Sequence, residues 1–275
     1  MQPTLPLEAL DSQTADWRRL GGPSVHCAAM TQSELVTTAS PLINTLGSAF
    51  YFTPATLARG KELGLRGMQY YILGRGGVLG DADSSVIRSA FGYFNATVIR
   101  DAWDSGRAIV APRVAGHEYF QSAAQHGRTM LADTPGMEAF ADAAAAINDA
   151  ADDTGLPLYA GIKSEPLADD VPARAYQLVT VLRELRGSAH LLALRAVGID
   201  DKVAHFIKRP DAVKMFGYTP EDVPTFTDAM HAAMSEAEVL TDRLVTPAYA
   251  GLSEAQQSAL VDGLHAIQKA HTPAS

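Results

Sequence analysis

The sequence predicts a mostly α-helical fold with little β structure, arranged as two similar helical halves. Alanine, the strongest helix former, is concentrated in tracts such as FADAAAAINDAA (140–151) and FTDAMHAAMSEAEVL (226–240). Runs of β-branched residues are short, which disfavours strands. Two tripeptides also recur in the same order, LRG at 65–67 and 185–187 and FGY at 91–93 and 216–218. This repeated order predicts an internal duplication.

Residues 1–37 are predicted to form an N-terminal extension with a short helix near Trp17, because polar and turn-forming residues surround a GGP segment. The first helical half is predicted over residues 38–132. Its clearest start signal is Thr53 as N-cap, with Pro54 at the first helical position. The other boundaries expected in this half are a helix end at Gly74, a loop through Gly80, and helix caps at Ser84 or Ser85 and at Asn95.

A connecting helix is predicted over residues 133–155, opened by an Asp-Thr-Pro segment and ended by Gly155. The second helical half follows over residues 156–275. Its first long helix is amphipathic, and Gly187 is expected to end or kink it. The apolar stripe of this helix consists of residues 175, 178, 179, 182 and 185. Two later helices are predicted to start at Thr219, with an interruption at Pro224, and at Ser253.

Composition limits the classes of function. The net charge of −9 opposes nucleic-acid binding unless basic residues gather on one face. Cys27 is the only cysteine, so a cysteine-rich zinc site is not expected, and the segment AGHEYFQSAAQH lacks the HExxH spacing of a zinc protease. We therefore predict no metal site. No apolar run reaches the roughly 20 residues of a membrane span, so we expect a cytoplasmic protein without a membrane partner.

Glu184 and His190 are the candidate catalytic residues. A carboxylate can orient a histidine, which titrates near neutral pH, as a general acid or base. The two residues are six positions apart, so this interpretation requires a bend at Gly187. The alternative is that Glu184 forms a salt bridge with Arg186 and that His190 is a packing residue.

A ligand pocket is predicted at the seam between the two halves, because pockets favour such interfaces. Its candidate ligand-binding residues are Tyr70, Tyr71, Arg75, Arg186, Thr241 and Asp242. The alternatives remain that the tyrosines belong to the core and that GRGGVLGD is a plain turn. The first functional hypothesis is a small-molecule-binding helical protein, with acid/base catalysis on an apolar or aromatic metabolite as its enzymatic form. The cofactor is unknown.

The alternative hypothesis is a DNA-binding transcriptional regulator of helix-turn-helix type that uses residues 200–235. This stretch combines short helical patterns with basic residues, as a helix-turn-helix unit does. Acidic residues flank it, so its net charge is nearly neutral. A homodimer is a further expected partner. The basic residues are Lys202, His205, Lys208, Arg209 and Lys214.

Three segments carry a resemblance to a known family: RELRGSAHLLALRAVGIDD (183–201), FGYTPEDV (216–223) and TDRLVTPAYAGL (241–252). They resemble segments of the actinobacterial SalK-like helix-turn-helix family. The first half also resembles this family, in the segment FYFTPATLARGKELGLRG, so the resemblance covers about residues 40–265. It implies winged-helix-like helix arrangements. The residues that match the family's motifs are Glu184, Arg186, Gly187, His190, Thr241, Asp242, Pro247 and Leu252.

The chain departs from this family at the wing. AMHAAM continues directly into SEAEVLTDRL with a helical pattern, so no hairpin is expected between them. Leu185 and Ala189 also replace a histidine and a glycine of the first motif, and Tyr249 stands at the usual tryptophan position. The loss of the wing removes one of the usual phosphate contacts of a winged-helix module. The sequence therefore favours small-molecule binding over DNA binding.

Overall fold

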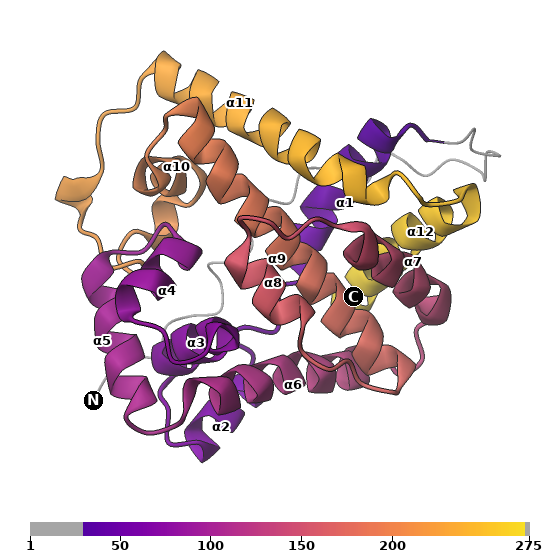
Figure 1. Ribbon diagram of the computed structural model, residues 1–275, viewed down its shortest axis with the longest axis horizontal. Helices are drawn as coiled ribbons and strands as arrows, with labels where there is room; N and C mark the ends of the chain where they lie inside the picture. Colours follow the sequence, from indigo (N-terminus) through magenta and orange to yellow (C-terminus); the bar gives the residue numbers. More distant parts are fainter. Residues whose placement is uncertain (1–29, 273–275) are drawn as a thin grey trace.

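The computed structural model describes residues 30–272, and this range contains helices and no strand (Figure 1). The predicted mostly α fold is therefore confirmed, while Cys27 and the helix expected near Trp17 lie outside the described residues. The α-helices are α1 (Gln32–Leu46), α2 (Pro54–Glu62), α3 (Gly67–Gly76), α4 (Ser84–Phe91), α5 (Ala96–Arg107), α6 (Pro112–Met130), α7 (Met137–Ala150), α8 (Pro157–Lys163), α9 (Val171–Val197), α10 (Asp201–Lys208), α11 (Asp228–Val245) and α12 (Glu254–His271). The 3-10 helices are η3 (Gly77–Leu79), η4 (Pro210–Ala212), η5 (Pro220–Asp222) and η6 (Thr246–Tyr249).

Three predicted helix starts are confirmed by their caps. The Thr53 side chain accepts a hydrogen bond from the Thr56 N–H at the start of α2. The Asn95 side chain accepts one from Thr97 at the start of α5, and Ser253 forms a capping box that opens α12. Each cap satisfies an N–H group that the first helical turn leaves without a partner, so these starts depend on local sequence alone.

Several other helix boundaries differ from those predicted. Helix α3 continues to Gly76 instead of Gly74, α4 follows Asp83 instead of Ser84 or Ser85, and α7 ends at Ala150, before Gly155. Thr219 caps only η5, and α11 begins at Asp228, because Pro224 cannot continue a helix and restricts the residue before it. From Asp228 the helix then runs unbroken to Val245, as expected for a chain without the wing.

Gly187 neither ends nor interrupts α9, contrary to prediction. The helix runs without a break from Val171 to Val197. A glycine inside a helix costs only about 1 kcal/mol relative to alanine. Burial of neighbouring side chains such as Leu182, Leu185 and Ala189 outweighs that cost.

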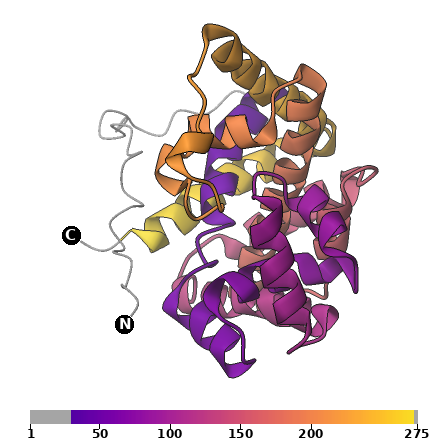
Figure 2. The same ribbon diagram turned by 90° about the vertical axis from the view of Figure 1, so that its left-hand side faces the viewer.

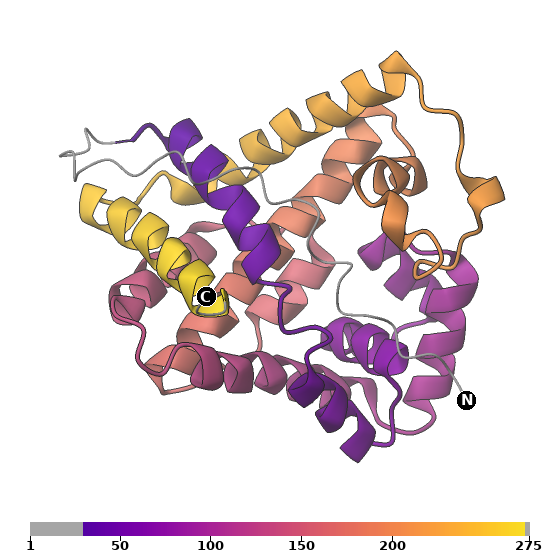
Figure 3. The ribbon, with the colours of Figure 1, turned by 180° about the vertical axis from the view of Figure 1, so that it is seen from behind.

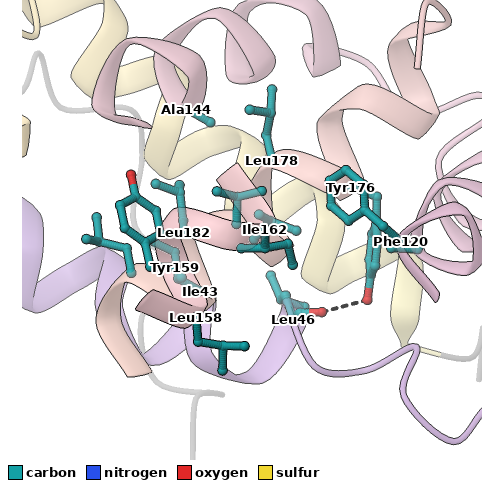
Figure 4. Packing of buried hydrophobic residues seen from close by; sticks show 14 of the residues in the cluster. Ile43, Leu46, Phe120, Ala144, Leu158, Tyr159, Ile162, Tyr176, Leu178 and Leu182 are labelled. Carbon is teal, nitrogen blue, oxygen red and sulfur yellow. Dashed lines mark hydrogen bonds between the residues drawn. The ribbon is translucent and has the colours of Figure 1, made fainter. Parts of the chain in front are cut away.

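Helix α9 organises the core. It packs against α1, α6, α7, α8 and α11, and it crosses the middle of the molecule in opposite views (Figures 1 and 3). Figure 4 shows part of this packing, where the buried Tyr176 hydroxyl donates a hydrogen bond of 2.6 Å to the Leu46 carbonyl. The other side chains labelled there are Ile43, Phe120, Ala144, Leu158, Tyr159, Ile162, Leu178 and Leu182.

One large apolar cluster contains residues from both predicted halves, from Leu35 to Ile267. Helix α1 also crosses the predicted boundary between residues 37 and 38. In the view of Figure 2, α2 to α5 of the first predicted half lie below α10 and α11 of the second. Each FGY repeat contains a positive-φ glycine, Gly92 or Gly217. The LRG repeats differ, because the first ends at Gly67, the first residue of α3, and the second lies inside α9. The division into duplicated halves stays a prediction.

No helix within residues 30–272 has the length and apolar character needed to cross a membrane.

Candidate functional site

The Glu184 carboxylate lies at the centre of a buried ion-pair cluster between α3 and α9. Arg75 donates two parallel hydrogen bonds, from Nε to Oε1 and from Nη2 to Oε2, each of 2.8 Å. Arg183 donates a third hydrogen bond of 2.8 Å, and the Tyr51 hydroxyl donates a fourth of 2.9 Å. Glu184 is 1% exposed, so these bonds take the place of its hydration.

Aromatic rings hold the Arg75 guanidinium in place. Its central carbon lies 4.4 Å from the centroid of the Phe91 ring, and its Nη1 donates a hydrogen bond of 3.1 Å to the Tyr71 hydroxyl. The Arg183 guanidinium lies 5.4 Å from the Tyr51 ring centroid. Because a guanidinium is planar and weakly hydrated, it suits both the two-pronged carboxylate contact and stacking on rings. We call this set, Tyr51, Tyr71, Arg75, Arg183 and Glu184, the buried ion-pair cluster.

Charge pairing keeps Glu184 ionised. Burial alone raises the pKa of a carboxyl, but the Arg75 and Arg183 guanidinium groups and their hydrogen bonds outweigh burial and lower the pKa of Glu184 to about 2. At neutral pH the carboxylate is therefore charged and accepts bonds at both oxygens. This arrangement suits structural charge pairing, and a role of Glu184 in proton transfer stays a prediction.

A small cavity adjoins this cluster. Its volume is about 10 Å³, and Tyr51, Arg75, Tyr119 and Glu184 are among the residues that line it. The Tyr119 hydroxyl is buried and has no hydrogen-bond partner among the residues of the structure. A volume of this size holds about one water molecule, so the cavity is far smaller than a metabolite.

The two tyrosines predicted to bind a ligand contact different residues. Tyr71 joins Arg75 in the buried ion-pair cluster, whereas the Tyr70 hydroxyl lies 3.1 Å from the Ser122 hydroxyl. Both rings are buried in the apolar core. Tyr51 and Arg183 were not among the predicted site residues, although Arg183 stands directly beside Glu184 in the chain.

His190 does not contact Glu184. On an unbroken helix, six residues at about 100° each place two side chains about 120° apart. His190 instead contacts Thr241 on α11, with its Nδ1 2.8 Å from the Thr241 hydroxyl oxygen. That hydroxyl donates its only proton to the Ala237 carbonyl, so His190 Nδ1 carries the proton and Nε2 keeps a lone pair.

Arg186 and Asp242 lie beside His190 in the same α9–α11 interface. Arg186 forms a 2.7 Å ion pair with Glu238, and its distance to Asp242 is 3.7 Å. Glu238 also pairs with Lys208 at 2.7 Å. The structure therefore does not contain the Glu184–Arg186 salt bridge of the alternative interpretation, since Glu184 pairs with Arg75 and Arg186 with Glu238. Glu238, which sequence reasoning did not identify, lies three residues before Thr241 on α11.

We expect acid to destabilise the fold through two histidines, His205, which is buried, and His190, which is partly buried. Burial, together with the nearby Arg186 and Lys208, lowers the pKa of His190 to about 4, and burial likewise lowers that of His205 to about 4. The unfolded chain, with an ordinary histidine pKa near 6.5, therefore binds these protons first, and stability falls as pH drops from about 6.5 towards 4.

The variant His190→Gln keeps an N–H donor for Thr241 but does not titrate. We expect it to remove up to about 2 kcal/mol of the stability loss between pH 7 and pH 5. Urea unfolding at both pH values measures this difference. The matched control is His265→Gln at an exposed position of α12, which should lose stability as the wild type does. An unchanged pH dependence in His190→Gln would show that His190 is not held neutral by burial.

Helices α4 and α5 are joined by a short turn, which is the order of elements in a helix-turn-helix unit, and we call them the α4–α5 unit. Their connection, residues 92–95, is four residues long and contains two positive backbone φ angles, 61° at Gly92 and 59° at Tyr93. Short turns with glycine are typical of this motif. Helix α5 buries Ile99, Ala102 and Trp103 and exposes its opposite face.

The turn of this unit is fixed to the second half of the chain. The Asp201 carboxylate accepts a hydrogen bond of 2.6 Å from the Tyr93 N–H, which stabilises the uncommon left-handed conformation there. The Asn95 N–H donates to the Phe216 carbonyl at 2.9 Å, and the rings of Phe94 and Phe216 stack with centroids 4.0 Å apart. These contacts fix the orientation of α5 relative to α10 and the segment after it (Figure 1).

A helix-turn-helix family model matches residues 36–275 of the sequence. The chain belongs to this helix-turn-helix family. No curated protein and no solved structure was found to match it. The narrower SalK-like resemblance stays a prediction.

In a helix-turn-helix protein, an exposed helix that follows a short turn contacts the DNA. In the 200–235 stretch that the sequence favoured, no α-helix follows α10 until α11 begins at Asp228. Two basic side chains of this stretch pair with acids, Lys208 with Glu238 at 2.7 Å and Arg209 with Asp211 at 3.2 Å. Helices α9 and α10 are also joined by a short turn with a left-handed Gly198, but Lys208 at the end of α10 is paired with Glu238, so we take the α4–α5 unit as the candidate helix-turn-helix.

Proposed function

We propose that this helix-turn-helix protein binds double-stranded DNA and presents α5 to the major groove. The observation that carries this proposal is the exposed face of α5, which follows the four-residue turn of the α4–α5 unit. In helix-turn-helix proteins the second helix enters the groove, and its N-terminal residues contact base edges. Thr97 and Arg100 occupy that position and are exposed.

Arg100 is the principal candidate for base contact. Arginine makes two hydrogen bonds to the edge of guanine, the commonest specific contact in the major groove. Arg100 pairs with Asp101 at 3.0 Å, and the two side chains are 57% and 64% exposed. An ion pair this exposed contributes at most about 1 kcal/mol, so DNA can replace Asp101 as the partner of Arg100.

The charge on α5 predicts weak nonspecific binding. Asp101 and Asp104 balance Arg100 and Arg107 on this helix, and the whole chain carries a net charge of −9. Few phosphates can then be neutralised, so the binding energy has to come from a small number of specific contacts. We expect a shallow salt dependence, with a logarithmic slope between about −1 and −4.

A metabolite pocket between the two halves has weaker support. The cavity beside Glu184 measures about 10 Å³, room for about one water molecule. The candidate catalytic pair is also separated, since Glu184 pairs with Arg75 and His190 with Thr241. These observations favour DNA binding over small-molecule chemistry at that seam.

Selection from random duplexes tests the proposal. The full chain is incubated with random 20-base-pair duplexes at low salt, and enriched sequences are then titrated by fluorescence anisotropy at several salt concentrations. We expect a specific sequence to be enriched and Asp104→Asn to bind it more tightly, because a charge that repels phosphate is removed. Asp262→Asn, an exposed change on α12, is the control that leaves affinity unchanged. Absence of any enriched sequence, or of detectable binding, contradicts the proposal.

A further inference from the structure

Two histidines from distant parts of the chain meet near the end of α12. His126 lies on α6, and His271 is the last residue of α12. Their Nε2 atoms are 2.8 Å apart. Neither residue belongs to the buried ion-pair cluster or to the α4–α5 unit.

A backbone carbonyl fixes the tautomer of His271. Its Nδ1 lies 2.8 Å from the Ile267 carbonyl oxygen, which only accepts, so Nδ1 carries the proton. Its Nε2 therefore accepts a hydrogen bond from the His126 Nε2–H, and a metal ion between the two nitrogens would take the place of that proton. A ring N–H held by a backbone carbonyl is the arrangement found behind most metal-ligating histidines.

The two rings are held rigidly by Tyr176. His126 packs edge-on against the Tyr176 ring with centroids 4.6 Å apart, and His271 stacks on the same ring at 5.8 Å. Tyr176 is completely buried and is itself fixed by its hydrogen bond to Leu46. The nitrogen atoms are therefore positioned before any ligand arrives, which lowers the entropic cost of binding one.

The spacing of the nitrogens, which a hydrogen bond sets here, is compatible with adjacent ligand positions on one metal ion. Two nitrogens about 2.0 Å from one ion lie about 2.8 Å apart when their bonds form a right angle, but about 3.3 Å apart at the tetrahedral angle that zinc prefers. Right-angled nitrogen ligands are typical of Cu²⁺ and Ni²⁺. No group of three or more histidine, cysteine, aspartate or glutamate side chains in residues 30–272 is arranged to hold a metal. The remaining coordination positions are therefore assigned to water.

We propose that His126 and His271 form a two-histidine site for Cu²⁺ or Ni²⁺ that joins the end of α12 to α6. This site differs from the expectation of no metal, which considered cysteine-rich and HExxH patterns only. A ligand pair separated by 145 residues leaves no local spacing signal in the sequence.

Calorimetric titration of the full, untagged chain with NiCl₂ or CuCl₂ alone tests this site. His126→Gln and His271→Ala should each weaken the affinity at least about tenfold, since even an outer residue behind a ligand is worth that much. His265→Ala, an exposed histidine on the same helix, should leave the affinity unchanged. Electron paramagnetic resonance of the Cu²⁺ complex should show two equatorial nitrogen ligands.

The wild type alone provides a second test that does not depend on the variants folding. Ni²⁺ should slow modification of His126 and His271 by diethylpyrocarbonate at least about tenfold, with His265 unaffected. Equal modification with and without Ni²⁺ would overturn the proposal. So would a His126→Gln/His271→Ala double variant that folds and binds as tightly as the wild type, or an equal loss in His265→Ala.

Discussion

Glu184→Gln is expected to lower the free energy of unfolding by about 3–5 kcal/mol, the range for breaking a buried ion pair by removing one partner. The glutamine keeps the size of the side chain, so the loss comes from charge and not from a cavity. Arg75 and Arg183 then remain as neighbouring buried cations without a counter-ion, with side chains 9% and 19% exposed. Their mutual repulsion adds to their lost hydrogen bonds.

Urea unfolding at pH 7 measures this loss. The matched control is Glu138→Gln, which breaks an ion pair with Arg174 at a glutamate that is 64% exposed, and it should cost less than about 1 kcal/mol. Because the folded pKa of Glu184, about 2, is below the ordinary 4.5, its contribution is present above pH 4.5 and is lost as pH falls towards 2. The wild type and Glu184→Gln should therefore converge in acid. Equal losses in the two variants at pH 7 would show that the cluster is not a buried charge pair.

Gly77→Ala is expected to cost about 3 kcal/mol, at the upper end of the range for overpacking. Gly77 begins η3, whose backbone lies directly on α6. An added Cβ would overlap the Pro112 carbonyl oxygen and would lie 2.8 Å from the Gly116 nitrogen. Both obstacles are backbone atoms, which cannot rotate away, so η3 and α6 would have to separate. Arg75, two residues earlier, would lose its position in the cluster.

Gly187→Ala is the matched control for this change. Gly187 lies inside α9, and the nearest atom to an added Cβ is Arg183 Nη1 at 3.7 Å, an ordinary contact. Alanine favours the helix, so this variant should gain up to about 1 kcal/mol. The denaturant midpoints of the two variants should thus move in opposite directions. A midpoint for Gly77→Ala equal to that of the wild type would contradict the close contact of η3 with α6.

Local signals were sufficient for the helical fold and for several helix starts. The caps at Thr53, Asn95 and Ser253 depend on side chains within a few residues, so the sequence alone identifies them. Gly187 was misjudged because the stability of α9 comes from burial against other helices, which local propensity does not include.

The candidate site depended on contacts far apart in the chain. Glu184 and Arg75 were both singled out, but their pairing spans 109 residues and was not predicted. The separation of Glu184 from His190 follows from helical geometry once α9 is known to be continuous. The 200–235 stretch is a weaker candidate for DNA binding than its sequence indicated, because Glu238, which lies outside it, pairs with the basic side chain of Lys208.

The affinity of Arg100→Ala for the selected duplex tests the central claim most directly. The control is Lys269→Ala, an exposed cation on α12, which lies on the other side of the molecule from α5 (Figures 1 and 3). Loss of a base-contacting arginine is worth about 1–3 kcal/mol, so fluorescence anisotropy should show a loss of at least about fivefold for Arg100→Ala and no change for Lys269→Ala. Equal affinities for Arg100→Ala and the wild type would contradict a DNA-binding role for α5.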